Sequence, residues 1–375
     1  MTVVRFPEDW ASLDVALSHD WLTGMRGGER VLEWLCRGFP RATVLTLIHN
    51  PAAVSDVIAA HPVRTSPLQR LPGIGERYRR LLPLFPWAFG RLRAPPADLL
   101  ISTSHCLAKA VRAPPGARHL CYCFTPMRYA WTFYEEYFGR NPLKRRALAP
   151  LLARLREADL RANERVDRFV TLSRHVQERI RRFYGREADV VYPPVDVDFF
   201  TPGDAARDAA APAFDLIVSA LVPYKRIDLA VRAYSRTGFP LKVVGVGTEF
   251  PALRAAAAPN VEFLGRLEDG AVRALYRACR LLVFPGEEDF GIVPVEAQAC
   301  GRPVVAFGRG GARETVEDGV TGLFFDAQEE DALIAAVESA AARAWDAAAI
   351  RRRAERFHPQ AFVDGLAASI RACRA

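Results

Sequence analysis

The 375-residue sequence lacks the marks of several protein classes. No apolar run approaches the 18 residues of a membrane-spanning helix, and the N-terminus shows no basic segment followed by an apolar run. We therefore expect a cytoplasmic protein without a transmembrane helix or a signal peptide. The P-loop motif G-x-x-x-x-G-K-[ST] is absent, and Phe250 replaces the third glycine of a dinucleotide fingerprint that begins at Gly245. A P-loop site is unsupported and a dehydrogenase is disfavoured.

The cysteines give no support for a disulfide framework, and neither they nor the paired aspartates give support for a metal site. The seven cysteines form no C-x-x-C motif, their number is odd, and no set of histidines and cysteines has ligand spacing. Asp196 and Asp198 form a D-x-D pair without a third carboxylate nearby, so a turn or capping role is predicted. The sequence predicts reduced, mostly buried thiols in a reducing compartment and no bound metal.

The residues that are present describe a globular α/β protein of two domains. Half of the residues are apolar and a quarter are charged, and the length suggests two domains at about 150 residues each. Residues 202–212 are small, polar and bounded by proline, which predicts a linker. Apolar runs alternate with helical stretches on both sides of it, and this alternation predicts a doubly wound parallel sheet in each domain. The candidate strands are 13–18, 42–48, 97–102, 117–124, 168–173 and 189–192, then 214–220, 241–245, 261–264, 281–284, 303–307 and 322–325.

Residues 281–301 hold the clearest candidate site. An apolar run ends at Pro285, three carboxylates follow at 287–289, and a helix is expected from Ile292 to Gly301. Ligands of open α/β sheets bind at the carboxyl ends of strands, where helix N-termini offer free N–H groups. Glu288 and Glu296 could both bind the hydroxyls of a sugar. Alternatively, the loop is merely solvated and Glu296 lies on an exposed helix face.

Two other strand-to-helix turns could approach a phosphate. Gly27 and Gly28 follow the first strand, and Glu29 opens a helix, which is a geometry that brings backbone close to a ligand. Lys225 follows the first strand of the second half, where a diphosphate would bind. A simple tight turn at the glycines and a solvated basic turn at the lysine are the plain alternatives.

The segment Arg64–Arg93 carries most of the chain's net charge of +8. Its seven arginines stand against one glutamate, giving +6, and leucine, phenylalanine and tryptophan are interleaved with them. This pattern is typical of an element that binds an anionic membrane surface. It is equally compatible with a basic solvated face over ordinary core, and nucleic acid is a third possible partner.

Taken together, these stretches resemble glycosyltransferase family 4, which has the two-domain GT-B fold. The resemblance is carried by GEEDFGIVPVEAQACGRPVVA at 286–306, LVPYKRID at 221–228 and GMRGGERV at 24–31. The phrases CYCFTPMRYAW at 121–131 and GEEDFGIVP at 286–294 are similar to the branch of mannosyltransferases that use GDP-mannose. The resemblance covers nearly the whole chain.

The resemblance implies a fold and a reaction. Residues 1–200 would form an acceptor-side Rossmann-like domain, residues 201–355 a donor-binding one facing it across a cleft, and the last helix, 356–375, would pack back on the first. The enzyme would be a retaining, metal-independent hexosyltransferase without a cofactor. It would move a sugar, mannose from GDP-mannose, to a lipid-linked oligosaccharide or other glycan. It would work as a peripheral protein on the inner membrane face, without a nucleic-acid partner.

The resemblance also assigns roles to single residues. Glu288 would bind donor hydroxyls, Glu296 the ribose, and Lys225 the leaving diphosphate. The backbone positions that would contact the donor are Phe290 and Gly291 at the sugar, Gly265 and Arg266 at the base, and Gly27 and Gly28 at the phosphates.

Two positions depart from the family pattern. Ala220 stands where the family often has an arginine that partners the phosphate lysine, so Arg226 or Arg313 is expected to compensate. Phe124 stands where the family has a histidine, and His105 is expected to act in its place.

Two other functions fit parts of the sequence. A nucleotide-sugar epimerase shares the fold and would convert the donor without an acceptor. A non-enzymatic nucleic-acid-binding protein would use Arg64–Arg93, although that segment lacks a known reading motif.

Overall fold

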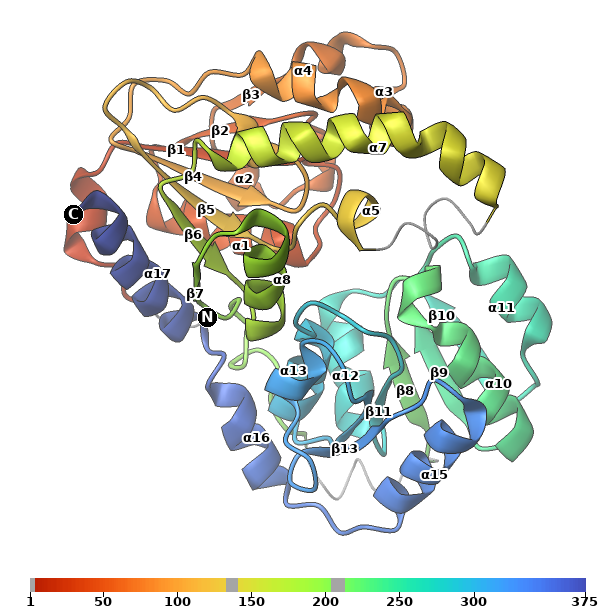
Figure 1. Ribbon diagram of the computed structural model, residues 1–375. Helices are drawn as coiled ribbons and strands as arrows, with labels where there is room; N and C mark the ends of the chain where they lie inside the picture. Colours follow the sequence, from red (N-terminus) through yellow and green to blue (C-terminus); the bar gives the residue numbers. More distant parts are fainter. Residues whose placement is uncertain (1–3, 133–140, 204–212) are drawn as a thin grey trace. The chain divides into compact units, whose positions relative to one another are not determined.

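The computed structural model describes residues 4–132, 141–203 and 213–375, which divide into two compact units (Figure 1). Residues 4–194 and 360–375 form the N-terminal unit, and residues 195–359 form the C-terminal unit. The chain thus passes between the units after Pro194 and after Pro359, rather than after residues 200 and 355 as expected. The segment predicted as a linker, 202–212, lies mostly outside the described residues.

The N-terminal unit contains a seven-stranded parallel sheet in the order β3-β2-β1-β4-β5-β6-β7. Its strands are β1 (Val15–His19), β2 (Thr43–Thr46), β3 (Val63–Thr65), β4 (Leu99–Ser104), β5 (Arg118–Cys123), β6 (Arg168–Thr171) and β7 (Ala188–Val190). Six of the seven were predicted. Strand β3 was missed because it is a three-residue edge strand with no buried residue, so it leaves no apolar run in the sequence.

The helices of this unit follow the expected spacing of apolar residues. The α-helices are α1 (Gly27–Gly38), α2 (Asp56–Ala59), α3 (Ile74–Arg77), α4 (Phe85–Gly90), α5 (Arg128–Trp131), α7 (Pro142–Asn163), α8 (Arg174–Tyr184) and α17 (Pro359–Arg374). Short 3-10 helices are η1 (Glu8–Ser12), η2 (Pro51–Ala53), η3 (Pro67–Arg70), η4 (Tyr78–Leu84) and η5 (Ala108–Ala110). In α17, Phe362 packs edge-on against Tyr122 at 5.8 Å, and Ser369 donates to Asp189 at 2.9 Å. The last helix therefore packs on β5 and β7.

The C-terminal unit contains a six-stranded parallel sheet in the order β10-β9-β8-β11-β12-β13. All six strands were predicted: β8 (Asp215–Val218), β9 (Leu241–Val244), β10 (Val261–Gly265), β11 (Leu282–Phe284), β12 (Val304–Phe307) and β13 (Gly322–Phe325). Its helices are η6 (Pro223–Lys225), α10 (Ile227–Thr237), α11 (Phe250–Ala256), α12 (Asp269–Ala278), α13 (Ile292–Ala299), α14 (Ala312–Thr315), α15 (Glu330–Ala341) and α16 (Ala347–Glu355). The α/β class with parallel doubly wound sheets is confirmed.

The ends of the C-terminal unit lie next to each other, since the amide of Val195 donates to the carbonyl of Phe357 at 3.0 Å. The carboxylate of Asp196 accepts from the amide of Phe199 at 3.0 Å within a turn, which confirms the turn role among the two predicted. Asp198 lies 3.4 Å from the imidazole of His358. No group of metal-ligating side chains occurs in the described ranges.

Two further expectations concern the cysteines and the membrane. All seven cysteines are buried free thiols, as predicted. Among the helices of the described ranges, none is both long and apolar enough to cross a membrane.

Candidate active site

In each sheet the strand order reverses direction at one place, and chemically active side chains gather there. In the C-terminal unit the reversal lies between β8 and β11. Lys225 follows β8, Glu288 follows β11, and the ammonium and the carboxylate form an ion pair. Both side chains are largely buried, with exposed fractions of 13% and 19%. The structure therefore brings these two predicted residues together at the place where open α/β sheets bind ligands.

Glycines allow the loops around this pair to approach closely. A Cβ atom on Gly286 would lie 2.8 Å from the Cα of Lys225, and one on Gly311 would lie 2.3 Å from the Cα of Phe290. The amide of Gly311 also donates to the carbonyl of Glu288 at 2.8 Å. The loop after β12 thus packs against residues 287–290, the acidic loop, and supports it.

Helix α13 begins at Ile292 as predicted, with Gly291 before it in the left-handed region at φ 97°. Glu296 is buried within this helix and accepts a hydrogen bond from the hydroxyl of Tyr276 at 2.9 Å. The alternative of an exposed helix face is therefore wrong. Phe290 is buried as well and packs edge-on against Phe357 at 5.3 Å.

Arg226 links the loop after β8 to the loop after β11 through Gln328, a residue that sequence reasoning missed. Its guanidinium donates to Gln328 at 2.9 Å and to Asp228 at 3.3 Å, and Gln328 donates to the carbonyl of Pro285 at 2.9 Å. Arg226 also has a positive φ of 53°, which is uncommon for a residue other than glycine. These contacts give it a role in bracing the loops. No periodic signal in the sequence points to Gln328.

The other predicted donor-binding residues lie farther along the same edge of the sheet. Gly265 ends β10, the strand that borders the sheet on this side, and Arg266 is exposed just after it. Gly245 packs onto the loop after β8, since a Cβ there would lie 1.8 Å from the carbonyl oxygen of Ser219. This glycine therefore serves close backbone packing. Arg313 lies in α14 and donates to the carbonyl of Gly308 at 3.3 Å.

In the N-terminal unit the reversal lies between β1 and β4, and Asp20 and His105 meet there. The carboxylate of Asp20 is fully buried and lies 3.1 Å from Nδ1 of His105. It accepts hydrogen bonds of 2.6–2.9 Å from four consecutive backbone amides, those of residues 105–108. The imidazole, 34% exposed, packs edge-on against Trp21 at 4.5 Å. Asp20 thus fixes the predicted catalytic histidine, a role that sequence reasoning did not assign.

Gly27 and Gly28 lie beside the same group, but they open α1 themselves, so the helix begins two residues earlier than the expected start at Glu29. A Cβ on Gly28 would lie 3.2 Å from the ring of Phe124 and 3.5 Å from the ring of His19. The rings of Phe124 and His105 are 6.4 Å apart. Burial lowers the pKa of His19 to about 4 and raises the pKa of the Glu29 carboxyl to about 7. Sequence reasoning treated Glu29 only as the start of a helix.

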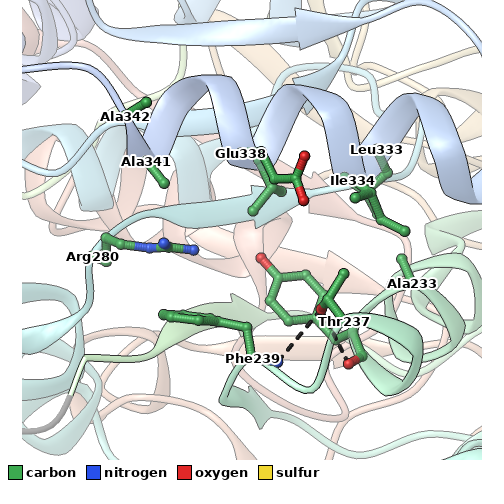
Figure 2. Close-up of a pocket in the computed structure, with 11 residues that line it drawn as sticks. Ala233, Thr237, Phe239, Arg280, Leu333, Ile334, Glu338, Ala341 and Ala342 are labelled. Carbon is green, nitrogen blue, oxygen red and sulfur yellow. Dashed lines mark hydrogen bonds between the residues drawn. The ribbon is translucent and has the colours of Figure 1, made fainter.

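A cavity of about 460 Å³ lies at the other end of the C-terminal sheet, between α10 and α15 (Figure 2). Tyr234 and Arg280 line it, and both bind Asp215, the first residue of β8. The Arg280 guanidinium lies 3.8 Å from the ring of Phe239. Since Lys225 follows the last residue of the same strand, this cavity is remote from the Lys225–Glu288 pair and shares no lining residue with it.

The segment Arg64–Arg93 folds into β3 and four short helices. Part of its apolar content joins the core: Ile74, Phe85 and Phe89 are buried. Leu84 and Trp87 are exposed, Trp87 by 48%. Within the described residues, none of the seven arginines forms an ion pair with a carboxylate. The structure thus combines a partly ordinary core with an exposed basic surface that carries apolar side chains, where the Arg91 guanidinium lies 5.5 Å from the ring of Trp87.

Comparisons with known proteins match both units. The family model for Glycosyltransferase Family 4 matches residues 25–199, and that for Glycosyl transferases group 1 matches residues 209–357. This chain belongs to glycosyltransferase family 4. The family 4 glycosyltransferase has the GT-B fold, in agreement with the Anabaena protein HepE in complex with UDP and glucose (TM-score 0.68, 19% identity, covering 96% of this chain and 100% of that one).

Curated relatives match part of this family 4 chain. A D-inositol 3-phosphate glycosyltransferase from Mycobacterium sp. (strain KMS) is 37% identical over 162 residues, covering 38% of this chain and 36% of the relative. One from Geodermatophilus obscurus is 34% identical over 233 residues, covering 54% and 52%. The chain therefore spans between about a third and a half of the length of these relatives.

Proposed function

We propose that the chain is a retaining glycosyltransferase that moves a hexose, mannose from GDP-mannose, to a lipid-linked oligosaccharide or another glycan. The observation that carries this proposal is the buried pair of Lys225 and Glu288 at the strand reversal of the C-terminal sheet. Membership of family 4 supports the reaction class. The choice of mannose and of GDP rests on the resemblance of residues 121–131 and 286–294 to the mannosyl branch.

The pair supplies the two charges that the reaction needs. Breaking a sugar–phosphate bond leaves negative charge on the diphosphate, and preorganised cations and backbone amides stabilise that charge. Lys225 would meet the diphosphate, and the amides of Phe290 and Gly291 would meet the sugar. Glu288 would accept hydrogen bonds from sugar hydroxyls. Donor binding thus replaces the ion pair with two contacts to one ligand.

The remaining predicted contacts complete the proposed donor site. Glu296 would bind the ribose through its carboxylate, which Tyr276 already orients. The backbone of Gly265 and Arg266 would meet the base, and the turn at 27–28 would meet the phosphates. Arg226 and Arg313 remain the candidates to replace the missing arginine at Ala220.

We propose retention by attack on the same face of the sugar. The acceptor oxygen bonds to the anomeric carbon as the bond to the diphosphate breaks, and the leaving phosphate takes the acceptor's proton. No nucleophile on the enzyme and no metal ion are required in this scheme, because Lys225 would stabilise the leaving diphosphate. His105, held by Asp20, would bind a polar group of the substrate from its partly exposed ring.

The acceptor is proposed to reach the enzyme at a membrane surface. Exposed arginines in the same segment as Leu84 and Trp87 can combine attraction to anionic lipid, about 1 kcal/mol per basic residue near the surface, with insertion of apolar side chains. The names of the curated relatives favour a second acceptor class, a phosphorylated polyol such as inositol phosphate.

A donor screen followed by turnover assays tests the proposal. GDP-mannose, UDP-glucose and ADP-glucose are compared for the rise in melting temperature that a ligand of the folded state produces. Glu288→Gln and Lys225→Met should each lower turnover by roughly tenfold or more, the loss of one charge-assisted contact. Matched controls are Glu262→Gln and Lys242→Met, because these residues form a more exposed pair at 3.8 Å in the same unit.

Several outcomes would defeat this assignment. Wild-type turnover in both site variants would remove the pair from the reaction. Conversion of the donor sugar without any acceptor, detected by NMR, would indicate an epimerase instead. Sensitivity to EDTA that added Mg²⁺ reverses would contradict the metal-independent scheme.

Sedimentation with vesicles tests the membrane surface. Binding to phosphatidylglycerol-containing vesicles should decline with salt and should weaken in Trp87→Ser, whereas the buried-face change Phe89→Leu should leave it unaltered in a folded protein. Equal binding to neutral vesicles would contradict the proposal. Steeply salt-dependent binding to DNA or RNA without turnover would favour the nucleic-acid alternative.

A further inference from the structure

The carboxyl group of Glu29 is enclosed at the start of α1, next to Gly27 and Gly28. Glu29 is only 5% exposed, although it lies in the first turn of α1 next to Gly28. Its Oε2 accepts a hydrogen bond from the amide of Arg26 at 3.2 Å, which closes the turn. Its Oε1 lies 4.0 Å from Nε2 of His19.

The contacts of His19 determine which of its nitrogens carries the proton. Its Nδ1 lies 2.8 Å from the hydroxyl of Thr103, and that hydroxyl donates its own hydrogen to the carbonyl of Ser18 at 3.2 Å. The hydroxyl oxygen must therefore accept from Nδ1–H, and Nε2 faces Glu29 without a proton. Since burial also lowers the pKa of His19 to about 4, the ring is neutral near pH 7 and cannot offset a charge on Glu29.

Few charges surround Glu29 to stabilise its ionised form. The charged and titratable groups that face it are Arg26 on the same turn, His19 and Asp20 at the end of β1, and Tyr78 on η4. Arg26 is exposed to solvent, and Asp20 carries the same charge as Glu29. Burial therefore raises the pKa of Glu29 to about 7, and the acid and the carboxylate coexist at neutral pH.

Buried hydroxyls nearby independently mark this end of the sheet as a place for a polar ligand. Thr125 follows Phe124, the residue whose ring lies against Gly28, and the carbonyl of Ser104 accepts from the amide of Phe124 at 2.8 Å. Both hydroxyls are buried, and neither has a hydrogen-bond partner among the described residues. Buried polar groups are nearly always satisfied, so a bound ligand or water is expected to complete them.

We propose that Glu29 is a proton-linked positioning residue, which takes up a proton when the diphosphate of a sugar nucleotide binds at Gly27 and Gly28, the first residues of α1. This inference rests on the function proposed above. The phosphates bring negative charge close to a carboxylate that has no buried cation beside it, so the carboxylate is neutralised by a proton from solvent. The new O–H on Oε1 points at the bare Nε2 of His19, while Oε2 keeps its bond to the amide of Arg26.

Calorimetry measures directly how many protons the protein takes up when the donor binds. GDP-mannose and UDP-glucose are titrated at pH 8 without acceptor, in two buffers of different ionisation enthalpy, because a sugar diphosphate has no phosphate that titrates there. The wild type should take up about 0.5–1 proton per donor bound, and its Kd should rise by up to about tenfold per pH unit above neutrality. Glu29→Gln should bind with no uptake and with a flat pH profile. Glu33→Gln is the matched control on the same helix and should behave like the wild type.

The outcomes separate this inference from the proposed function. Donor binding by the wild type without proton uptake, or equal uptake in Glu29→Gln, overturns the role of Glu29 and leaves the transferase standing. Failure of both sugar nucleotides to bind overturns both. Should Glu29→Gln not fold, infrared difference spectra of the wild type decide: the protonated-carboxyl band must grow on donor addition and shift in Glu29→Asp.

Discussion

The buried carboxylate of Asp20 offers the sharpest test of the N-terminal unit. Its two oxygens accept from four backbone amides, two each, at 2.6–2.9 Å. The change Asp20→Asn keeps the size of the side chain but turns one acceptor oxygen into an NH2 donor. Two of the four amides then face a donor and lose their partner.

The expected loss of stability follows from the two amides that lose their acceptor. A buried donor left without an acceptor costs about 1–3 kcal/mol, so two of them cost about 2–6 kcal/mol. A domain of 150–250 residues loses roughly 2–4 °C of melting temperature per kcal/mol, which predicts a decrease of about 10 °C. Because Trp21 packs against His105 at 4.5 Å, its fluorescence reports the same local change.

Thermal unfolding followed by circular dichroism and by tryptophan fluorescence measures this decrease. The control is Asp98→Asn, because Asp98 is an exposed residue of the same unit that accepts from a single amide, that of Asp14, at 3.2 Å. We expect the control to melt within about 2 °C of the wild type, as is usual for surface changes. Equal melting temperatures for the two variants would refute the argument that Asp20 holds this turn.

Three further changes have clear expected outcomes. Asp159→Asn removes the charge that pairs with the fully buried ammonium of Lys109 and should cost about 3–5 kcal/mol in urea unfolding. Burial lowers the pKa of His119 to about 4, below its value in the unfolded chain. The free energy of unfolding therefore falls as the pH drops below about 6.5, because the unfolded chain then binds a proton that the folded protein does not. His119→Gln should remove up to about 3 kcal/mol of that acid sensitivity. Gly311→Ala places a Cβ 2.3 Å from the Cα of Phe290 and should lower turnover at least roughly tenfold by displacing the acidic loop.

Each of these has its own control and contrary result. Glu157→Gln neutralises an exposed carboxylate on the same helix as Asp159 and should cost less than about 1 kcal/mol. If the urea midpoint of His119→Gln fell between pH 7 and pH 4 by as much as that of the wild type, the acid sensitivity would not come from His119. Gly270→Ala, where a Cβ meets nothing within 4 Å, should retain activity, and equal activity in Gly311→Ala would show that the loop tolerates the shift.

The regular elements were predictable because apolar periodicity is a local property of the sequence. The run 281–284 and the helix start at Ile292 follow from residue order alone, and the structure has β11 and α13 there. Strand β3 was not predictable, since its edge position leaves its residues partly exposed. The ends of the units were displaced by a few residues because contacts such as that of Val195 with Phe357 join distant parts of the chain.

The pairing within the candidate site could be anticipated only through strand topology. Lys225 and Glu288 were singled out separately, and the parallel order of β8 and β11 brings them together. Gln328 and Asp20 were missed because a side chain that holds a distant backbone leaves no periodic pattern. Burial of Glu29 was equally hidden, since a glutamate in a first helical turn reads as an exposed capping residue.

The two sheets place an acid and a base at their strand reversals, but the partners of the two acids differ. Asp20 is held by four backbone amides, so its carboxylate cannot turn to a ligand without leaving them unpaired. Glu288 is instead paired with the side chain of Lys225, which is long and flexible, so neither end of that pair is held by the backbone. Under the proposed function, Asp20 would hold His105 in a fixed place, whereas Lys225 and Glu288 would exchange charge partners on donor binding.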